Sequence, residues 1–419
     1  MSKITELLEA RDVEGLKALM AEHDLVLRDG KIVPRDDAVK AHFKHQKEFW
    51  DQRQQARKIL LNSLYGALLN EGLRFYDERL GQSVTLTGRS IARHMNAKAN
   101  EVITGSYDHT GEAIVYADTD SCYFSAMPIL EKDPAYGNLT MGRDEIIGLY
   151  DGISSVVNDS FPEFMVASFN TTLERGAIIA AGRELVASTG LFIKKKKYAV
   201  LMYDKDGKRL DITKEGKNEP EPGKLKAMGL DLKRSDTPKF MQKFLEKVLM
   251  KLLTGGEKTD IMDDITDFRD AFKGRPAVEK GSPKKVNNLT AQGDKIKATQ
   301  VSDLFRSIGG KANIPGHVRA SINWNYLCEI NNDKFSMRIT DGSRIIVCKL
   351  KPNPDRIDSI AYPMDEPHLP KWFTDLPFDE EAMEETIIDK KLDNLVGVLG
   401  WDFEETKKRP GDEFFSFGK

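Results

Sequence analysis

The sequence Ala113-Ile-Val-Tyr-Ala-Asp-Thr-Asp-Ser-Cys-Tyr-Phe124 places two β-rich runs on either side of a short polar segment. Isoleucine, valine and aromatic residues favour strands, whereas Asp, Thr and Ser favour turns. The pattern therefore predicts a β-hairpin with Asp118 and Asp120 beside its turn, at the rim of a sheet.

The two carboxylates of this hairpin indicate a binding site for a cation. Like charges held close together either raise the pKa of one group or recruit a positive ion. Mg²⁺ is bound in proteins through one or two carboxylates together with substrate phosphates. The alternative is an ordinary surface turn, and the two residues alone do not decide between them.

A second motif lies at residues 58–66, Lys-Ile-Leu-Leu-Asn-Ser-Leu-Tyr-Gly. In a helix Lys58, Asn62 and Tyr65 are spaced i, i+4 and i+7, so they share one face. That face offers an ammonium, an amide and a phenol within an otherwise apolar helix, and lysine binds phosphate as a point charge. A solvated lysine near a helix end at Gly66 is the alternative.

A third motif is the run Lys194-Lys-Lys-Lys-Tyr198 between apolar β residues. We expect a strand over residues 191–203, with Lys194, Lys196 and Tyr198 on one face and Lys195 and Lys197 on the other. Lysines beside an aromatic residue suit a nucleic-acid backbone. A solvated edge strand that uses lysine to prevent aggregation is the alternative.

The rest of the chain predicts a mixture of helices, strands and one long polar loop. Helical periodicity favours helices over residues 3–23, 37–70, 82–104, 144–170 and 238–253, and Asp12 can cap the second half of the first. Residues 344–350, Arg-Ile-Ile-Val-Cys-Lys-Leu, resemble a strand, and the polar, basic residues 273–300 look mobile.

Composition excludes several classes of protein. The 419 residues are 40% hydrophobic and 31% charged, with three scattered cysteines, which excludes a disulfide-stapled fold and a structural zinc site. No apolar run is long enough for a membrane span, and the first residues resemble neither a signal nor a transit peptide. Residues 355–419 hold 17 acidic and 8 basic residues, so a mildly basic body precedes an acidic end.

Together and in this order, the three motifs resemble family B DNA polymerases. Residues 58–66 look like motif B of the fingers, Tyr116–Ser121 like motif C of the palm, and Lys194–Tyr198 like the primer-gripping KKxY motif. Leu225-Lys-Ala-Met-Gly-Leu230 and Ser235-Asp-Thr-Pro-Lys239 are similar to the palm-to-thumb junction of T-even-type bacteriophage polymerases. Residues 317–326 look like a thumb segment, and residues 412–418 resemble the aromatic tail that docks on a sliding clamp.

The resemblance implies roles for the matching residues. Asp120, with Asp118 in a smaller part, would be catalytic and hold two Mg²⁺ ions. Lys58, Asn62, Tyr65 and Gly66 would bind the incoming nucleotide. Contacts to primer-template DNA would come from Lys195, Lys196, Tyr198, Lys239 and Arg319. The clamp would be bound by Phe414, Phe415 and Phe417.

The fold expected from this resemblance is mixed α+β, with the right-hand architecture of polymerases. Residues 1–72 would form an N-terminal segment and a helical fragment of the fingers, and residues 73–230 a palm with an antiparallel sheet. Residues 231–411 would form a mostly helical thumb, followed by the clamp-binding tail at 412–419. The implied activity is that of a DNA-directed DNA polymerase, a nucleotidyltransferase acting on dNTPs.

Family B polymerases also need a carboxylate from motif A, and nothing before Lys58 resembles that motif. We therefore expect the C-terminal subunit of a split phage replicative polymerase, active only with a second subunit that supplies motif A and the exonuclease. It would act in the cytoplasm of an infected bacterial host, without contact to a membrane. The alternatives are an inactive truncated fragment and a non-catalytic subunit that binds DNA and the clamp.

Overall fold

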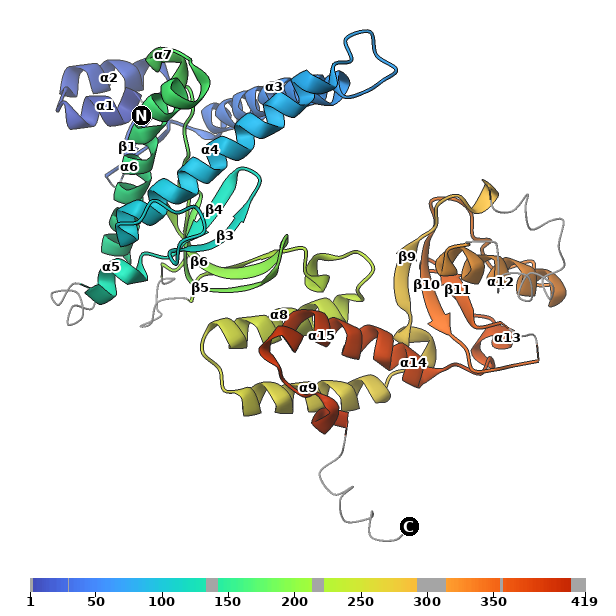
Figure 1. The fold of residues 1–419 in the computed structure, drawn as a ribbon. Helices are drawn as coiled ribbons and strands as arrows, with labels where there is room; N and C mark the ends of the chain where they lie inside the picture. The colour runs from blue at the N-terminus through green and yellow to red at the C-terminus, as the bar shows by residue number, and fades with distance from the viewer. Residues whose placement is uncertain are drawn as a thin grey trace. The chain divides into compact units, whose positions relative to one another are not determined.

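The structure is a computed structural model that describes residues 3–28, 30–132, 142–212, 222–291, 314–354 and 357–407 (Figure 1). The chain divides into two compact units, Met1–Met95 and Asn96–Lys419. The division falls within the long helix α4. Among the described residues, no helix combines the length and the apolar character that crossing a bilayer requires.

The first unit begins with a small helix pair and a β-hairpin, followed by two long helices. Its elements are α1 (Lys3–Glu9), α2 (Val13–Glu22), β1 (Leu25–Arg28), β2 (Lys31–Pro34), α3 (Asp37–Leu68) and the first part of α4 (Glu78–Thr104). The predicted cap is confirmed, because the Asp12 carboxylate accepts a hydrogen bond from the Gly15 amide at 2.9 Å. None of the residues of α3 is buried, so this long helix adds no buried side chain to an apolar core.

In the second unit the last part of α4 is followed by the hairpin predicted from the sequence. It comprises β3 (Ile114–Asp118) and β4 (Ser121–Phe124), followed by α5 (Met127–Lys132), α6 (Arg143–Phe169) and α7 (Leu173–Gly176). The hairpin forms a separate two-stranded antiparallel sheet. Its base packs through Ala113 and Ala126 against Ile103 of α4 and Ile153 of α6.

A four-stranded antiparallel sheet follows. Its strands are β5 (Leu185–Lys194), β6 (Lys197–Lys205), β7 (Lys208–Arg209) and β8 (Lys224–Met228), with β6 paired to each of the other three. Residues 198–204 of β6 are buried, which is the continuous burial expected of a central strand.

One face of β6 contributes Ala199 and Leu201 to the largest apolar core. The core is completed by η1 (Asp231–Lys233), α8 (Lys239–Leu253), α9 (Lys258–Lys273), the π-helical turn η3 (Glu385–Asp389) and α15 (Lys390–Val396). Leu245, Val248 and Leu249 of α8 are fully buried in it. Truncating Leu245 or Leu249 to alanine is expected to cost about 2–5 kcal/mol.

The last part of the second unit has its own core around Trp324. It is built from η2 (Ala277–Lys280), β9 (Ser282–Lys285), α12 (Gly316–Ile330), β10 (Arg344–Lys349), β11 (Ser359–Pro363), α13 (Lys371–Thr374) and α14 (Glu380–Glu384). The short turns η4 (Gly397–Leu399) and η5 (Glu404–Lys407) follow α15. The strands form a three-stranded antiparallel sheet in the order β11-β10-β9, with α12 against β11 (Figure 1).

This second core corrects one expectation. The sequence predicted a mobile loop over residues 273–300, but residues 282–285 form β9 and pair with β10. The motif Ser-Pro-Lys-Lys is short, polar and contains proline, so it carries no strand pattern of its own. Pairing with β10 holds it, and Pro283 is tolerated because β9 is an edge strand.

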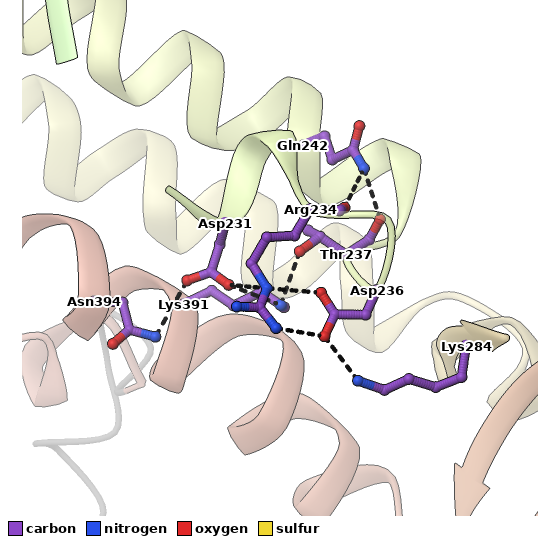
Figure 2. A network of polar contacts seen from close by, with 8 residues as sticks. All are labelled: Asp231, Arg234, Asp236, Thr237, Gln242, Lys284, Lys391 and Asn394. Carbon is purple, nitrogen blue, oxygen red and sulfur yellow. Dashed lines mark hydrogen bonds and ion pairs between the residues drawn. The ribbon is translucent and has the colours of Figure 1, made fainter. Parts of the chain in front are cut away.

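A polar network fixes the segment between β8 and α8 to the rest of the second unit (Figure 2). The Asp236 carboxylate binds Arg234 through two hydrogen bonds of 2.9 Å and Lys284 of β9 through one of 2.8 Å. The buried Lys391 of α15 donates to the Thr237 hydroxyl at 2.9 Å. The Arg234 guanidinium, together with Lys284, lowers the pKa of Asp236. The network therefore joins three segments that are far apart in the sequence.

Candidate active site

The hairpin β3–β4 carries Asp118 and Asp120 and is called the carboxylate hairpin from here on. Its two strands are joined by a tight turn. Asp118 pairs with Ser121, so Thr119 and Asp120 form the two-residue loop. Thr119 has φ +55°, which is rare for a β-branched residue and is typical of functional turns. The Ser121 hydroxyl donates to the Asp118 carbonyl at 3.1 Å, while the Asp120 side chain lies exposed.

The four lysines form the tip of a second hairpin, and the predicted alternation along one strand is wrong. Lys194 of β5 pairs with Lys197 of β6, which leaves Lys195 and Lys196 in the turn, and Lys196 has φ +63°. Hairpin turns are usually marked by Asn-Gly or Gly residues, and this run contains none. The sequence therefore gave no sign that the strand reverses here.

The structure brings these two hairpins together. The Lys196 amide donates a hydrogen bond of 2.7 Å to the hydroxyl of Tyr116, and the Lys195 ammonium lies 3.9 Å from a carboxylate oxygen of Asp118. Tyr123 of β4 donates to the Tyr198 hydroxyl at 3.3 Å. These contacts bring Asp118 beside the lysine turn.

An aromatic cluster of Tyr116, Tyr123, Phe192 and Tyr198 supports that site. Their ring centroids lie 5.2–6.2 Å apart. Tyr198 is only 9% exposed, and burial raises its pKa above the usual range. In this arrangement Tyr198 packs between the hairpins, where its hydroxyl accepts a hydrogen bond from Tyr123.

The predicted nucleotide-binding residues lie on α3, in the first unit. Lys58, Asn62 and Gly66 are exposed and Tyr65 is partly buried. The helix is continuous over residues 37–68, so the expectation that Lys58, Asn62 and Tyr65 share one face is confirmed. A Cβ atom built on Gly66 would meet nothing within 4 Å, so an approaching ligand would find open space there.

The remaining predicted contacts lie in the last part of the chain. Lys239 is exposed at the start of α8. Arg319 of α12 donates to the Asp358 carboxylate at 2.7 Å, so a contact with DNA requires it to leave that partner or share it. Burial lowers the pKa of His317 on the same helix. Phe414, Phe415 and Phe417 lie outside the described residues.

Two carboxylates are the donors that this hairpin offers to a metal ion. Their oxygen chemistry suits Mg²⁺. In the part of the chain that the structure describes, no three His, Cys, Asp or Glu side chains gather to hold an ion. Burial raises the pKa of Cys122 on β4 to about 12, which keeps its thiol protonated and a poor ligand. The donor set therefore fits Mg²⁺ in kind but needs further ligands.

Sequence reasoning missed the residues that hold the two hairpins together. Tyr116 shares a face of β3 with Asp118, and the period of a strand was the signal for that. Gly229, directly after β8, has φ +64°, and a Cβ atom there would lie 2.0 Å from the Lys196 carbonyl oxygen. The sequence alone gave no sign of that close approach.

Comparison with known proteins gives matches to one family. The family model "DNA polymerase family B" matches residues 35–132. The DNA-directed DNA polymerase of Escherichia phage RB69 is 28% identical over 316 residues, which cover 73% of this chain and 32% of the relative. That of Enterobacteria phage T4 is 26% identical over 377 residues, covering 83% and 37% respectively.

More distant matches include the DNA polymerase alpha catalytic subunit of Arabidopsis thaliana, 24% identical over 221 residues, 52% of this chain and 12% of the relative. The chain spans about a third of the length of the phage relatives that it matches. These relatives are DNA-directed DNA polymerases, which are nucleotidyltransferases. Residues 35–132, which hold α3, α4 and the carboxylate hairpin, are therefore similar to part of the domain that defines DNA polymerase family B.

Proposed function

We propose that this chain takes part in template-directed DNA synthesis, as the C-terminal subunit of a split phage replicative polymerase. The observation that carries the proposal is the carboxylate hairpin held against a lysine turn, within a chain similar to phage DNA polymerases. Carboxylates recruit metal ions and lysines bind phosphates, so the pair suits the joining of a nucleotide to a primer end.

Asp120 and Asp118 are proposed to hold two Mg²⁺ ions together with a carboxylate from a second chain. Bound Mg²⁺ would activate the primer hydroxyl and stabilise the leaving pyrophosphate. The exposed Asp120 is free to take a ligand, whereas Asp118 has Lys195 nearby. Positioning and charge neutralisation are then the main tasks of the protein.

Other residues that the sequence singled out are proposed to bind the substrates. On α3, Lys58 would meet the triphosphate of a dNTP, and Asn62, Tyr65 and Gly66 would line the nucleotide pocket. Lys195 and Lys196 would hold the backbone of the primer-template DNA. Lys239 and Arg319 would extend these contacts along the DNA.

The exposed apolar surface of α3 favours the proposal that a second chain binds here. Leu60 and Leu61 are each 70% exposed and Leu64 is 60% exposed. Several leucines exposed on one helix are unusual for a surface that stays in water and are typical of an interface. We propose that this face packs against the subunit that supplies motif A and the exonuclease.

Two further parts of the proposal concern partners and place. The aromatic residues Phe414, Phe415 and Phe417 would bind a sliding clamp. The complex would work in the cytoplasm of the infected bacterial host, where the template is.

A second candidate function is that of a non-catalytic subunit that binds DNA and the clamp. It is favoured by one observation, that the described residues offer two carboxylates at the hairpin and no cluster of three metal ligands. An inactive truncated polymerase fragment would share that feature.

Primer extension tests the proposal. The chain alone, with Mg²⁺, all four dNTPs and a labelled primer-template, is expected to bind the DNA but not to extend it. Addition of a chain that carries motif A is expected to start extension. Extension by this chain alone would contradict the split arrangement, and binding that never leads to extension with any motif A chain would favour the non-catalytic subunit.

A further inference from the structure

The turn at Lys195–Lys196 is held in an unusual conformation by a contact from another hairpin. Lys196 adopts φ +63°, a region that L-residues other than Asn and Asp seldom occupy. Its amide donates to the Tyr116 hydroxyl at 2.7 Å. The residues on either side, Lys194 and Lys197, pair with each other, and the contact from Tyr116 reaches the turn from outside this hairpin.

Tyr116 is well placed to link the turn to the carboxylates. It pairs with Tyr123 in β3–β4 and lies two residues before Asp118, so the two side chains share one face of the strand. Its ring stacks on Phe192, with centroids 5.6 Å apart, and tilts against Tyr198 at 5.3 Å. Phe192 and Tyr198 are themselves paired across β5 and β6, one step below the turn.

Gly229 supports the same turn from the other side. A Cβ atom at this position would lie 2.0 Å from the Lys196 carbonyl oxygen, closer than any real contact. The amide of Lys196 is therefore bonded to Tyr116, while its carbonyl oxygen lies in the space that a side chain at position 229 would need.

We propose that Tyr116 is a positioning residue, whose hydroxyl holds the Lys196 amide and so keeps the lysine turn beside Asp118. Lys195 and Lys196 then meet the nucleic-acid backbone at a fixed distance from the carboxylates. The inference rests on the proposed function in one respect, namely that the lysine turn binds primer-template DNA. The grip of Tyr116 on the turn is independent of that function.

Amide hydrogen exchange of the full chain tests directly whether the Tyr116 hydroxyl holds the Lys196 amide. In Tyr116→Phe the ring stays and only the hydroxyl is lost, so exchange in peptides that cover residues 194–198 is expected to accelerate. Tyr150→Phe is the matched control. The Tyr150 hydroxyl also accepts a hydrogen bond from a backbone amide, that of Ala126 at 3.1 Å, but away from the turn. It is expected to leave exchange at the turn unchanged. Gly229→Ala is a second route to the same effect, since it displaces the Lys196 carbonyl.

Binding of a labelled primer-template tests whether the grip positions the lysines. Tyr116→Phe loses one hydrogen bond, so its affinity for the primer-template is expected to be about fivefold lower than that of the unaltered chain. In a chain that already carries Lys195→Gln and Lys196→Gln, Tyr116→Phe is expected to cause no further loss, because it acts through the turn. A merely structural role would weaken both backgrounds equally.

The outcomes separate the two proposals. Unchanged exchange at the turn in Tyr116→Phe would contradict the inference that the Tyr116 hydroxyl holds the turn. Faster exchange with unchanged DNA affinity, or equal losses in both lysine backgrounds, would overturn the positioning role. If the unaltered chain does not bind primer-template at all, the proposed DNA-binding function fails together with the positioning role, while the exchange result still reports on the grip.

Discussion

At the scale of single residues, the site depends on two backbone positions in the left-handed region. Thr119 lies in the turn of the carboxylate hairpin, Lys196 lies in the turn between β5 and β6, and both have positive φ. Such conformations cost about 1–3 kcal/mol each and persist where surrounding contacts impose them. The contacts here are the ladder pair Asp118–Ser121 and the bond from Lys196 to Tyr116.

Asp211 gives a prediction about pH at the same scale. Its buried carboxylate binds Arg209 at 2.8 Å and also Arg143 of α6. The Arg209 guanidinium, with Arg143, lowers the pKa of Asp211 from 3.8 to about 2. The folded state therefore favours the charged form, and this stabilisation is complete above the ordinary pKa and is lost as the pH falls from about 4 to about 2.

Asp211→Asn is accordingly expected to lower the free energy of unfolding by about 2 kcal/mol at pH 6, because both arginines lose a charged partner. Urea unfolding followed by circular dichroism at pH 6 and pH 3 measures the difference between variant and unaltered chain. The difference is expected to shrink at pH 3. A gap that stays constant or widens there would contradict the role of the charge.

At the scale of elements, the sequence predicted the features that carry strong local patterns. The helices at 37–70, 82–104, 144–170 and 238–253 correspond to α3, α4, α6 and α8, and the hairpin around Asp118 corresponds to β3–β4. These segments have clear helical periodicity or a polar turn between apolar runs.

The features that the sequence could not predict depend on contacts from distant parts of the chain. The lysine run turns because β5 and β6 pair and Tyr116 holds the tip, and no turn residue marks it. Ser282–Lys285 becomes a strand because β10 offers a free edge. Tertiary contacts decide such positions, whereas propensity has little influence there.

The apolar face of α3 gives a prediction at this scale. Because Leu60 and Leu64 are exposed, Leu60→Gln with Leu64→Gln is expected to change the stability of the isolated chain by less than about 0.5 kcal/mol. The same pair of changes is expected to weaken association with the motif A chain at least tenfold. Leu173→Gln, at a leucine 59% exposed on α7, is the control. Analytical ultracentrifugation of the mixture measures association, and an unchanged affinity would exclude this face as the interface.

At the scale of the whole molecule, the last described residues are fastened to the core of the second unit. The fully buried Arg269 donates to the Thr406 hydroxyl at 2.9 Å and to Glu384 at 2.9 Å, and it also binds Asp389. The chain up to Lys407 is thus part of the fold, and residues 412–419 follow it.

Deletion of residues 412–419 leaves these contacts of Arg269 in place. Basal primer extension by the two-chain complex is therefore expected to continue at its full rate, while stimulation by a sliding clamp is lost. Extension assays with and without the clamp measure both quantities. An equal loss of basal and clamp-stimulated synthesis would show that the tail serves the fold or the active site and not the clamp.

The central claim is that the carboxylate hairpin is one half of a polymerase active site. It is tested most directly by primer extension with the two-chain complex that carries Asp120→Asn. The control is Asp206→Asn, because Asp206 is also an exposed aspartate in a hairpin turn, between β6 and β7, and has positive φ. Asp120→Asn is expected to reduce extension at least about a hundredfold with DNA binding retained, and Asp206→Asn to leave it unchanged. Extension that survives Asp120→Asn at the rate of the control would contradict the account.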